Sequence, residues 1–346
     1  MKSLAIKYRP KEFRDVVEQT NIKTILQQQI SQSEFNHTYL FVGGAGTGKT
    51  TCARIFAQEI NKYQGNPIEI DGASHNGVDD VREIINLAQT KSIDSEYKVF
   101  IIDECHMLSV SAWNAMLKLI EEPPIKSIFI FCTTDPQKIP ATIISRVQRY
   151  DFQLISRQGI VNRLKYILHE EKIYESKNDL DTITTTLNYI ATIANGHMRN
   201  AITMLDKCLG YSCILTLDNV INALGVADYS NMMKLLSSIT DGEPENMITE
   251  LDDIAFKGID LKQFIRQFID FVYDVKVYSV TGKFELTQLP NTDDMCDYLD
   301  SKKNEYDTLT NLLNKLVKLN SDIKYDNNPK YLIGCALWEV LDESNR

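Results

Sequence analysis

The sequence predicts an α/β fold in which a parallel sheet is followed by helical domains. Apolar runs at residues 39–42, 99–102 and 127–132 are typical of strands that are buried on both faces. Each run is followed by a helix-compatible segment, and strand–helix units in series predict a parallel sheet wound by helices. From residue 156 onward the pattern is almost wholly helical.

A glycine-rich stretch follows the first predicted strand. Residues 43–50 read Gly-Gly-Ala-Gly-Thr-Gly-Lys-Thr and match the pattern G-x-x-x-x-G-K-[ST], and a helix is predicted over 51–61. In such a phosphate loop, backbone N–H groups surround phosphate oxygens and the helix adds its positive N-terminal end. Lys49 can then reach the β and γ phosphates, and Thr50 can offer its hydroxyl to Mg²⁺. The agreement of strand, loop and helix argues against a chance glycine-rich turn.

Two carboxylates, Asp103 and Glu104, end the strand predicted over 98–104. In an open α/β sheet the strand ends form the ligand crevice, so these side chains can lie beside the phosphate loop. Asp103 is then expected to hold Mg²⁺ through water, and Glu104 to polarise the attacking water. The alternative is a strand that simply ends in solvated acids. The next strand ends in Thr133-Thr134-Asp135, where a polar side chain can sense a γ-phosphate.

The remaining elements are predicted from apolar periodicity and turn residues. Tyr8-Arg9-Pro10 is irregular, and its spacing alone favours an N-terminal arm packed on the core. An apolar stripe in the helix at 261–280 is expected to exceed what a small bundle buries, which favours a subunit interface. Gly196, Gly210 and Gly225 are expected to separate helices. The expected elements are a strand at 67–71, a closing segment at 142–149, a loop at 282–297, and helices at 21–33, 78–90, 111–122, 160–171, 179–195, 198–209, 217–224, 261–280, 306–319 and 331–341, with a third block from Asp228.

Charge and composition limit the partners. Residues 151–346 hold 20 Lys and Arg against 30 Asp and Glu, whereas residues 1–150 hold 17 of each, so the second part supplies the whole net charge of −10. This argues against a uniform nucleic-acid-coating surface, and any DNA contact needs a local patch on the first half. The seven scattered cysteines fit a reducing compartment. No apolar run has the length of a membrane span and no signal peptide is recognisable, so we expect a cytoplasmic protein.

Together these motifs resemble the gamma/tau ATPase subunits of the bacterial DNA polymerase III clamp loader. They are also similar to the ATPase subunits of phage and eukaryotic clamp loaders. The resemblance covers residues 1 to about 210. It rests on Tyr8-Arg9-Pro10 with Phe13, the phosphate loop, and the segments 69–74 (EIDGAS), 102–109 (IDECHMLS), 119–124 (LIEEPP), 133–140 (TTDPQKIP), 145–146 (SR) and 196–201 (GHMRNA).

The resemblance implies an AAA+ nucleotide-binding domain at residues 1–155, a helical lid at 156–226 and an all-α collar for oligomerisation at 227–346. It implies that Glu104 is the catalytic base and that Arg146 is an arginine finger acting in trans on a neighbouring subunit's ATP. Thr134 would be the γ-phosphate sensor, and Arg199 would report nucleotide to the lid. Mg²⁺ is expected at Thr50 and Asp103. The residues expected at ATP are Tyr8, Arg9, Pro10, Gly43, Gly46, Thr47, Gly48, Lys49, Thr50, Thr51, Thr134 and Arg199.

The implied function is that of a clamp-loader ATPase subunit. ATP binding would drive opening of a sliding clamp, and hydrolysis would release the clamp on primer–template DNA during replication. The implied partners are the sliding clamp, primer–template DNA and other clamp-loader subunits in a pentameric assembly, in a bacterial cell or a phage-infected host. No membrane partner and no polymerase activity are expected. Two alternatives remain, namely an AAA+ DNA-remodelling or branch-migration ATPase, and a nucleotide-binding scaffold without hydrolysis.

The resemblance also implies that the loop Ser74-His75-Asn76-Gly77 and the helix start behind it face DNA phosphates, a role that backbone N–H groups suit, and we expect residues 88–96 to approach the clamp. The alternative for His75 is a plain loop residue. The sequence departs from the gamma/tau pattern because residues 61–67 stand in place of a four-cysteine zinc module, and Val147 stands where the family has cysteine. No polymerase-binding tail follows Arg346, so we expect no tau-like tether and a phage or reduced replisome as the source.

We predict that the protein holds no structural zinc, because no four thiolates are spaced to close a tetrahedral site. Cys208 and Cys213 lie near each other in sequence, and the other five cysteines are far apart. Elemental analysis of the purified protein is expected to find no stoichiometric metal of this kind. About one tightly held zinc per chain would contradict the prediction.

Overall fold

The computed structural model describes residues 3–173, 180–225, 229–287, 289, 293–326 and 328–344. The chain divides into two compact units, one of residues 1–174 with 194–206 and the other of residues 175–193 with 207–346. Asp179 and Asp228, which begin a predicted helix and the predicted third block, lie outside the described residues. The division into three domains at residues 155 and 226 stays a prediction.

The first unit contains a sheet of five parallel strands in the order β2-β3-β4-β1-β5, which confirms the predicted parallel sheet. β1 and β4 lie inside the sheet and are buried at every residue. Their near-continuous apolar sequences follow from this position, because neighbouring strands cover both edges and helices cover both faces. The strands are β1 (Thr38–Val42), β2 (Ile68–Asp71), β3 (Lys98–Asp103), β4 (Ser127–Thr133) and β5 (Gln148–Asp151).

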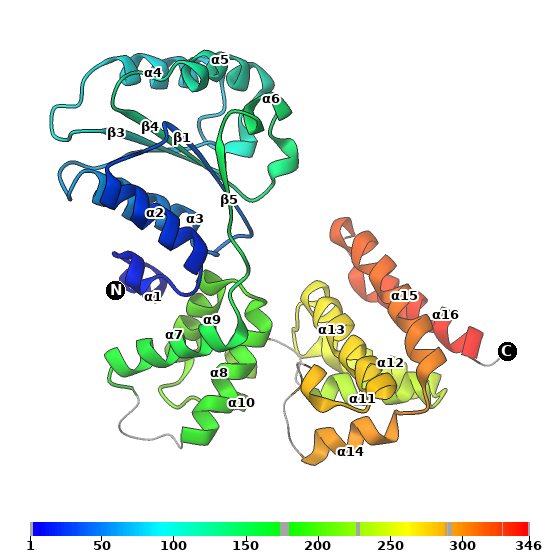
Figure 1. Ribbon diagram of the computed structural model, residues 1–346. Coiled ribbons are helices and arrows are strands. Elements are labelled where there is room, and N and C mark those ends of the chain that lie inside the picture. The colour runs from blue at the N-terminus through cyan, green and yellow to red at the C-terminus, as the bar shows by residue number, and fades with distance from the viewer. Residues whose placement is uncertain are drawn as a thin grey trace. The chain divides into compact units, whose positions relative to one another are not determined.

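Alternate residues along the strands build two apolar layers. On one face, Tyr39 and Phe41 of β1 pack in a cluster with α2 and α3. On the other face, Leu40 and Val42 pack with α4 and α5. Figure 1 shows the two helix pairs on opposite sides of the sheet. The helices are α2 (Thr20–Gln32), α3 (Lys49–Ile60), α4 (Val78–Gln89) and α5 (Val110–Glu121).

The sequence predicts four of the five strands, three of them from apolar runs, and misses β5. Tyr150 is buried, but the other three side chains of β5 are exposed, because this strand lies at the edge of the sheet. A search for apolar runs cannot detect such a strand. The segment 142–149 therefore contains most of a short helix and the start of β5 rather than one closing element. The short helices of this unit are α1 (Leu4–Lys7), η1 (Phe13–Asp15), η2 (Cys105–Met107), η3 (Pro136–Lys138) and α6 (Ala141–Ile144).

The predicted helices between residues 156 and 225 are present with shifted ends. Ser156 begins the first of them, and its hydroxyl accepts a hydrogen bond from the Gly159 N–H. Gly210 does not separate helices as predicted, because α9 continues through Tyr211. Gly225 does end a helix, in the left-handed conformation typical of a C-cap. The helices are α7 (Arg157–Glu170), α8 (Leu180–Ala194), α9 (Met198–Tyr211) and α10 (Leu217–Leu224).

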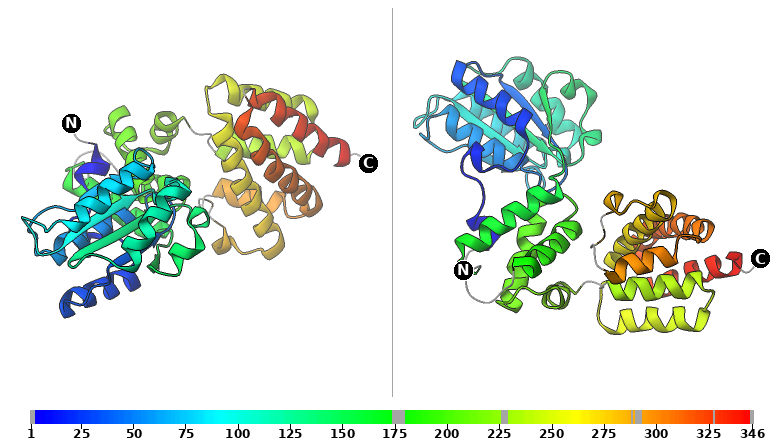
Figure 2. Two further views of the ribbon diagram at one scale, coloured as in Figure 1. Left: turned by 90° about the horizontal axis from the view of Figure 1, so that it is seen from above. Right: turned by 60° about the horizontal axis from the view of Figure 1, so that its bottom comes forward.

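Helices also build the chain from Tyr229 onward, and their apolar faces share one core (Figure 2). Phe264, Phe268 and Phe271 of α13 are at most 2% exposed, and each ring stacks on the next. The expectation that this stripe exceeds what the bundle buries is wrong, because α11, α14, α15 and α16 pack against α13. The helices are α11 (Tyr229–Thr240), α12 (Pro244–Phe256), α13 (Leu261–Thr281), α14 (Asp293–Ser301), α15 (Tyr306–Asp322) and α16 (Pro329–Ser344), with η4 (Phe284–Leu286) and η5 (Ile323–Tyr325).

The predicted loop at 282–297 is too long. η4 lies within it, and α14 begins at Asp293, before the predicted end of the loop. Acidic residues in this stretch suggested a loop, but acidic residues also favour the first turn of a helix through the macrodipole. Across the described ranges, no helix combines the length and the apolar character needed to cross a membrane.

The buried aromatic stripe predicts a large stability effect. We expect Phe268→Ala to lower the free energy of unfolding by about 3–5 kcal/mol, because it leaves a cavity between two stacked rings. Urea unfolding followed by circular dichroism measures the loss. Phe256→Ala is the matched control, since that ring is 94% exposed and its removal should change stability little. Equal effects of the two substitutions would contradict the packing described for α13.

Candidate nucleotide-binding site

The phosphate loop, residues 43–50, connects the end of β1 to the start of α3. Gly46 has a φ of 72°, and Gly48, which caps α3, has a φ of 108°. Both angles are in the region that glycine adopts without strain. A Cβ on Gly46 would also lie 3.0 Å from the Cβ of Arg199, so the loop approaches α9 closely. The conformation leaves the first N–H groups of α3 without helical partners, which suits an anion.

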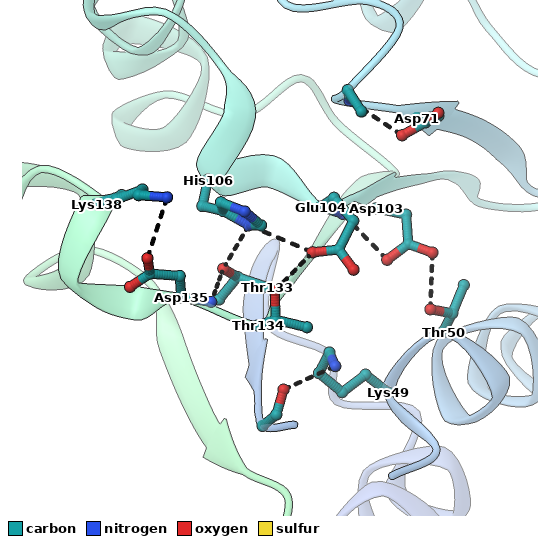
Figure 3. Close-up of polar contacts among 12 residues, drawn as sticks. Lys49, Thr50, Asp71, Asp103, Glu104, His106, Thr133, Thr134, Asp135 and Lys138 are labelled. Carbon is teal, nitrogen blue, oxygen red and sulfur yellow. Dashed lines mark hydrogen bonds and ion pairs between the residues drawn. The ribbon is translucent and has the colours of Figure 1, made fainter. Parts of the chain in front are cut away.

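Lys49 is the first residue of α3 and is 5% exposed. Its ammonium nitrogen donates hydrogen bonds to the carbonyl oxygens of Gly43 and Gly44, both at 2.8 Å. Burial lowers the pKa of Lys49. The Lys49 side chain thus folds back over the phosphate loop, and its ammonium group lies at the carbonyl oxygens of Gly43 and Gly44 (Figure 3).

Thr50 and Asp103 join the phosphate loop to β3. The Thr50 hydroxyl donates to Oδ2 of Asp103 at 2.8 Å (Figure 3). A hydroxyl and a carboxylate are hard oxygen donors, and Mg²⁺ in nucleotide sites is bound by one or two such groups together with water and phosphate oxygens. The two side chains therefore fit a magnesium ion at this position.

Glu104 follows β3 in a left-handed backbone conformation, with a φ of 44°. This turn directs its side chain toward β4, where the Thr134 hydroxyl donates to Oε2 of Glu104 at 3.0 Å. The Glu104 side chain is 38% exposed, so it keeps access to solvent. The structure thus brings the predicted base and the predicted sensor into direct contact.

A pocket of about 490 Å³ lies against the phosphate loop. Its lining combines the loop, both carboxylates, the N-terminal arm and the start of α9. The roles of these residues stay predictions, but the structure places them around one cavity. The predicted site residues in the lining are Tyr8, Arg9, Pro10, Gly46, Thr47, Gly48, Lys49, Thr50, Thr51, Asp103, Glu104 and Arg199.

The N-terminal arm, residues 3–10, ties this pocket to α3 and to the end of α7. Nε of Arg9 donates to the Thr51 hydroxyl at 3.2 Å, and burial lowers the pKa of Arg9. The Tyr8 hydroxyl donates to Glu171 at 2.6 Å, and Arg163 donates to the Tyr8 carbonyl at 2.8 Å. The arm therefore packs on the core, as spacing alone suggested, and also lines the pocket, as the resemblance implied.

Arg146 lies at the opposite end of the sheet from the phosphate loop. Its carbonyl accepts a hydrogen bond from the hydroxyl of Thr38, the first residue of β1, whereas the phosphate loop follows Val42, the last. Five residues of strand separate these ends by roughly 15 Å. The Arg146 side chain is 41% exposed and pairs with Glu121 at 2.6 Å.

The loop at 74–77 is mostly exposed and precedes α4, and two of its polar groups already have partners. The Ser74 hydroxyl donates to Asp71 at 2.9 Å, and the Gly77 N–H donates to Asp80 at 3.0 Å. Two acidic residues, Asp79 and Asp80, occupy the first turn of α4. The negative charges of these carboxylates would repel a DNA phosphate at the start of α4.

Three residues at the site were not singled out from the sequence. His106 contacts Glu104 and lies in the segment 102–109, where its position two residues after the carboxylate is a signal in the sequence. Arg163 and Glu171 hold the N-terminal arm from α7 and from the residue that follows it. No local pattern marks those two, because they lie more than 150 residues from the arm they contact.

Comparison with known proteins identifies the family of the chain. Residues 66–156 match the model of the family described as DNA polymerase III, delta subunit, and residues 215–337 match DNA polymerase III subunits gamma and tau domain III. The chain is similar to DNA polymerase III subunit tau of Bacillus subtilis, with 33% identity over 98% of this chain and 63% of the relative. It is also 33% identical to DNA polymerase III subunit gamma of Buchnera aphidicola, over 79% of this chain and 80% of the relative.

Among solved structures, the chain is similar to the RuvB Holliday junction branch migration motor of Thermotoga maritima. The TM-score is 0.53 at 20% identity, over 67% of this chain and 79% of that one. This likeness concerns the fold alone. The chain spans less than two thirds of the Bacillus subtilis tau subunit, and its similarity to the Buchnera gamma subunit extends over most of both chains. The chain belongs to the DNA polymerase III gamma/tau family.

Proposed function

We propose that this protein is the ATPase subunit of a sliding-clamp loader, in which ATP binding drives clamp opening and hydrolysis releases the clamp on primer–template DNA. The observation that carries the proposal is the convergence of Lys49, Thr50, Asp103 and Glu104 at one pocket. The relatives, which are named tau and gamma subunits of DNA polymerase III, support it. We place the protein in the cytoplasm, with the clamp, DNA and other loader subunits as partners.

The residues divide the chemistry among them. Lys49 and the N–H groups of the phosphate loop would bind the phosphates, with the N-terminal arm near the adenine. A magnesium ion at Thr50 and Asp103 would neutralise charge on the β- and γ-phosphate oxygens. Glu104 takes a proton from the attacking water, whose oxygen bonds to the γ-phosphorus as the bond to the bridging oxygen breaks. Arg199, whose backbone approaches Gly46, would report the nucleotide to the lid.

Arg146 belongs to the neighbouring subunit's site in this proposal. It lies at the far end of β1 from its own phosphate loop, so its guanidinium cannot reach that loop without unfolding the strand end. Its exposed position and its pairing with a surface carboxylate leave it available to a neighbour. Such arginines are worth roughly 10³–10⁵ in rate. We also propose that the collar, residues 227–346, is the oligomerisation domain. The aromatic stripe of α13 is buried inside it, so other residues of the collar would contact the neighbouring subunit.

Two alternative functions have specific support. A branch-migration motor agrees with the RuvB-like fold, but at 20% identity that likeness does not extend to activity. A scaffold without hydrolysis agrees with the delta-subunit match at residues 66–156. Against the scaffold, the chain holds both a lysine in the phosphate loop and a carboxylate pair at the end of β3.

Stimulation of the ATPase tests the proposed function. We expect slow ATP hydrolysis by the assembled protein alone and a much faster rate when a cognate sliding clamp and primed DNA are both added. A second reaction tests for a branch-migration motor. It contains primed DNA and a Holliday junction, and the clamp is left out. Stimulation by the junction, with none by the clamp, would favour the motor, and no hydrolysis under any condition would favour the scaffold.

Substitutions at the pocket should separate binding from chemistry. We expect Lys49→Ala to lose ATP binding, because the phosphate charge loses its buried partner. Glu104→Gln should still bind ATP and hydrolyse it about 10²–10⁴ times more slowly, as expected when a general base is removed. Calorimetric titration and steady-state phosphate release measure the two effects. Wild-type turnover by Glu104→Gln would remove Glu104 from the base role.

Mixing two inactive variants tests whether Arg146 acts in trans. Arg146→Ala and Glu104→Gln subunits should each lack stimulated hydrolysis alone. Combined under conditions of assembly, they should recover part of the rate, because some interfaces pair an intact Glu104 with a neighbour's intact Arg146. Arg149→Ala is the matched control, since that arginine pairs with Asp151 on the same strand and should leave the rate unchanged. No recovery at any mixing ratio would overturn the assignment.

A further inference from the structure

His106 lies in η2, between the end of β3 and α5, and its side chain is 11% exposed. Nδ1 of its ring is 3.3 Å from Oε2 of Glu104 and 3.2 Å from the hydroxyl oxygen of Thr133 (Figure 3). None of the roles given above uses this ring, although it touches the predicted base directly.

The proton on the ring can be assigned from its neighbours. An ionised carboxylate only accepts hydrogen bonds, so the nitrogen that faces Glu104 must donate. The tautomer with hydrogen on Nδ1 is therefore the one that fits. The one hydrogen on Nδ1 is then shared between Oε2 of Glu104 at 3.3 Å and the hydroxyl oxygen of Thr133 at 3.2 Å, and that hydroxyl oxygen also accepts from the Asp135 N–H at 3.0 Å.

The ring is held by a rigid element. Thr133 is the last residue of β4 and is fully buried, so its hydroxyl is fixed by the sheet. Glu104 has no such support of its own, because it follows β3 in a left-handed turn and is partly exposed. His106 thus connects a partly exposed carboxylate to the buried end of a central strand.

The two donors meet the same oxygen of Glu104. In the described part of the chain, the hydrogen bond from Thr134 and the 3.3 Å contact of His106 both involve Oε2 of Glu104. Oε1 is left to take a proton. Thr134 is also the predicted γ-phosphate sensor, and a hydroxyl has one hydrogen to donate. If that hydrogen goes to a phosphate oxygen, only His106 still anchors Oε2.

We propose that His106 is a positioning residue for the catalytic base: its Nδ1–H anchors Oε2 of Glu104, so that Oε1 receives the proton of the attacking water. The inference rests on the proposed ATPase function and deepens it. Water gives its proton to Oε1, its oxygen bonds to the γ-phosphorus, and the bond to the bridging oxygen breaks to leave ADP and phosphate. His106 itself forms no bond to substrate.

Two substitutions separate positioning from a merely structural role. His106→Ala should lower kcat by roughly 10–100-fold, as expected when a group that orients a reacting side chain is lost, with the Kd for ATP unchanged. His106→Asn should recover most of kcat, because its amide N–H₂ takes the place of Nδ1–H. His169→Ala is the control, since that ring is 74% exposed and far along the chain.

The outcomes are distinguishable from failure of the proposed function. If the wild-type protein hydrolyses ATP and His106→Ala keeps the wild-type kcat, the positioning role is wrong and the ATPase assignment stands. If His106→Asn is as slow as His106→Ala, the Nδ1–H anchor is wrong. A weakened Kd for ATP in both variants would also overturn the proposal, because it would mark damage to the pocket. A wild-type protein without hydrolysis removes the proposed function itself.

Discussion

The parallel register of the central strands is the constraint on which the site depends. Val42 at the end of β1 pairs with Thr133 at the end of β4, and Ile102 of β3 pairs with Phe131 of β4. The strands therefore end together, and whatever follows them meets at one edge of the sheet. The phosphate loop, the two carboxylates and the sensor threonine are those following residues. Arg146 lies at the opposite end of the strands, beside Thr38 at the start of β1.

The contacts around the pocket link three parts of the first unit. The phosphate loop touches the start of α9 through Gly46 and Arg199, and the N-terminal arm joins α3 to Glu171 at the end of α7. Hydrogen bonds from Lys7 and Tyr8 lower the pKa of Glu171, so it stays ionised as the anchor of the arm. A ligand in the pocket would touch all three parts. This arrangement gives a physical route from nucleotide binding to the helices that follow the sheet.

Much of the fold could be predicted because strands buried on both faces have simple apolar sequences. β1, β3 and β4 were recognisable for this reason, and the phosphate loop because its conformation requires glycine. β5 was not recognisable, since Tyr150 is its only buried side chain. The number of helices around α13 was underestimated, so its stripe was mistaken for a contact surface. Long-range partners such as Glu171 leave no local signal.

The site was predictable as a set of residue types but not as a set of contacts. Spacing identifies Asp103 and Glu104 as strand-end carboxylates, and it cannot say which one turns toward Thr50 and which toward Thr134. The left-handed backbone of Glu104 decides this, by sending adjacent side chains in different directions. The turn at Glu104 also brings the His106 ring back toward the Glu104 carboxylate. The sequence alone does not predict this contact.

We propose that Thr50 and Asp103 hold a magnesium ion beside bound nucleotide. Titration of a non-hydrolysable ATP analogue, with and without Mg²⁺, tests it on the wild type and on Asp103→Asn. Asp71→Asn is the control, because Asp71 pairs with Asp103 in the sheet register but holds its own loop. We expect Mg²⁺ to tighten binding in the wild type and in Asp71→Asn, and to have little effect in Asp103→Asn. The same Mg²⁺ dependence in all three proteins would contradict it.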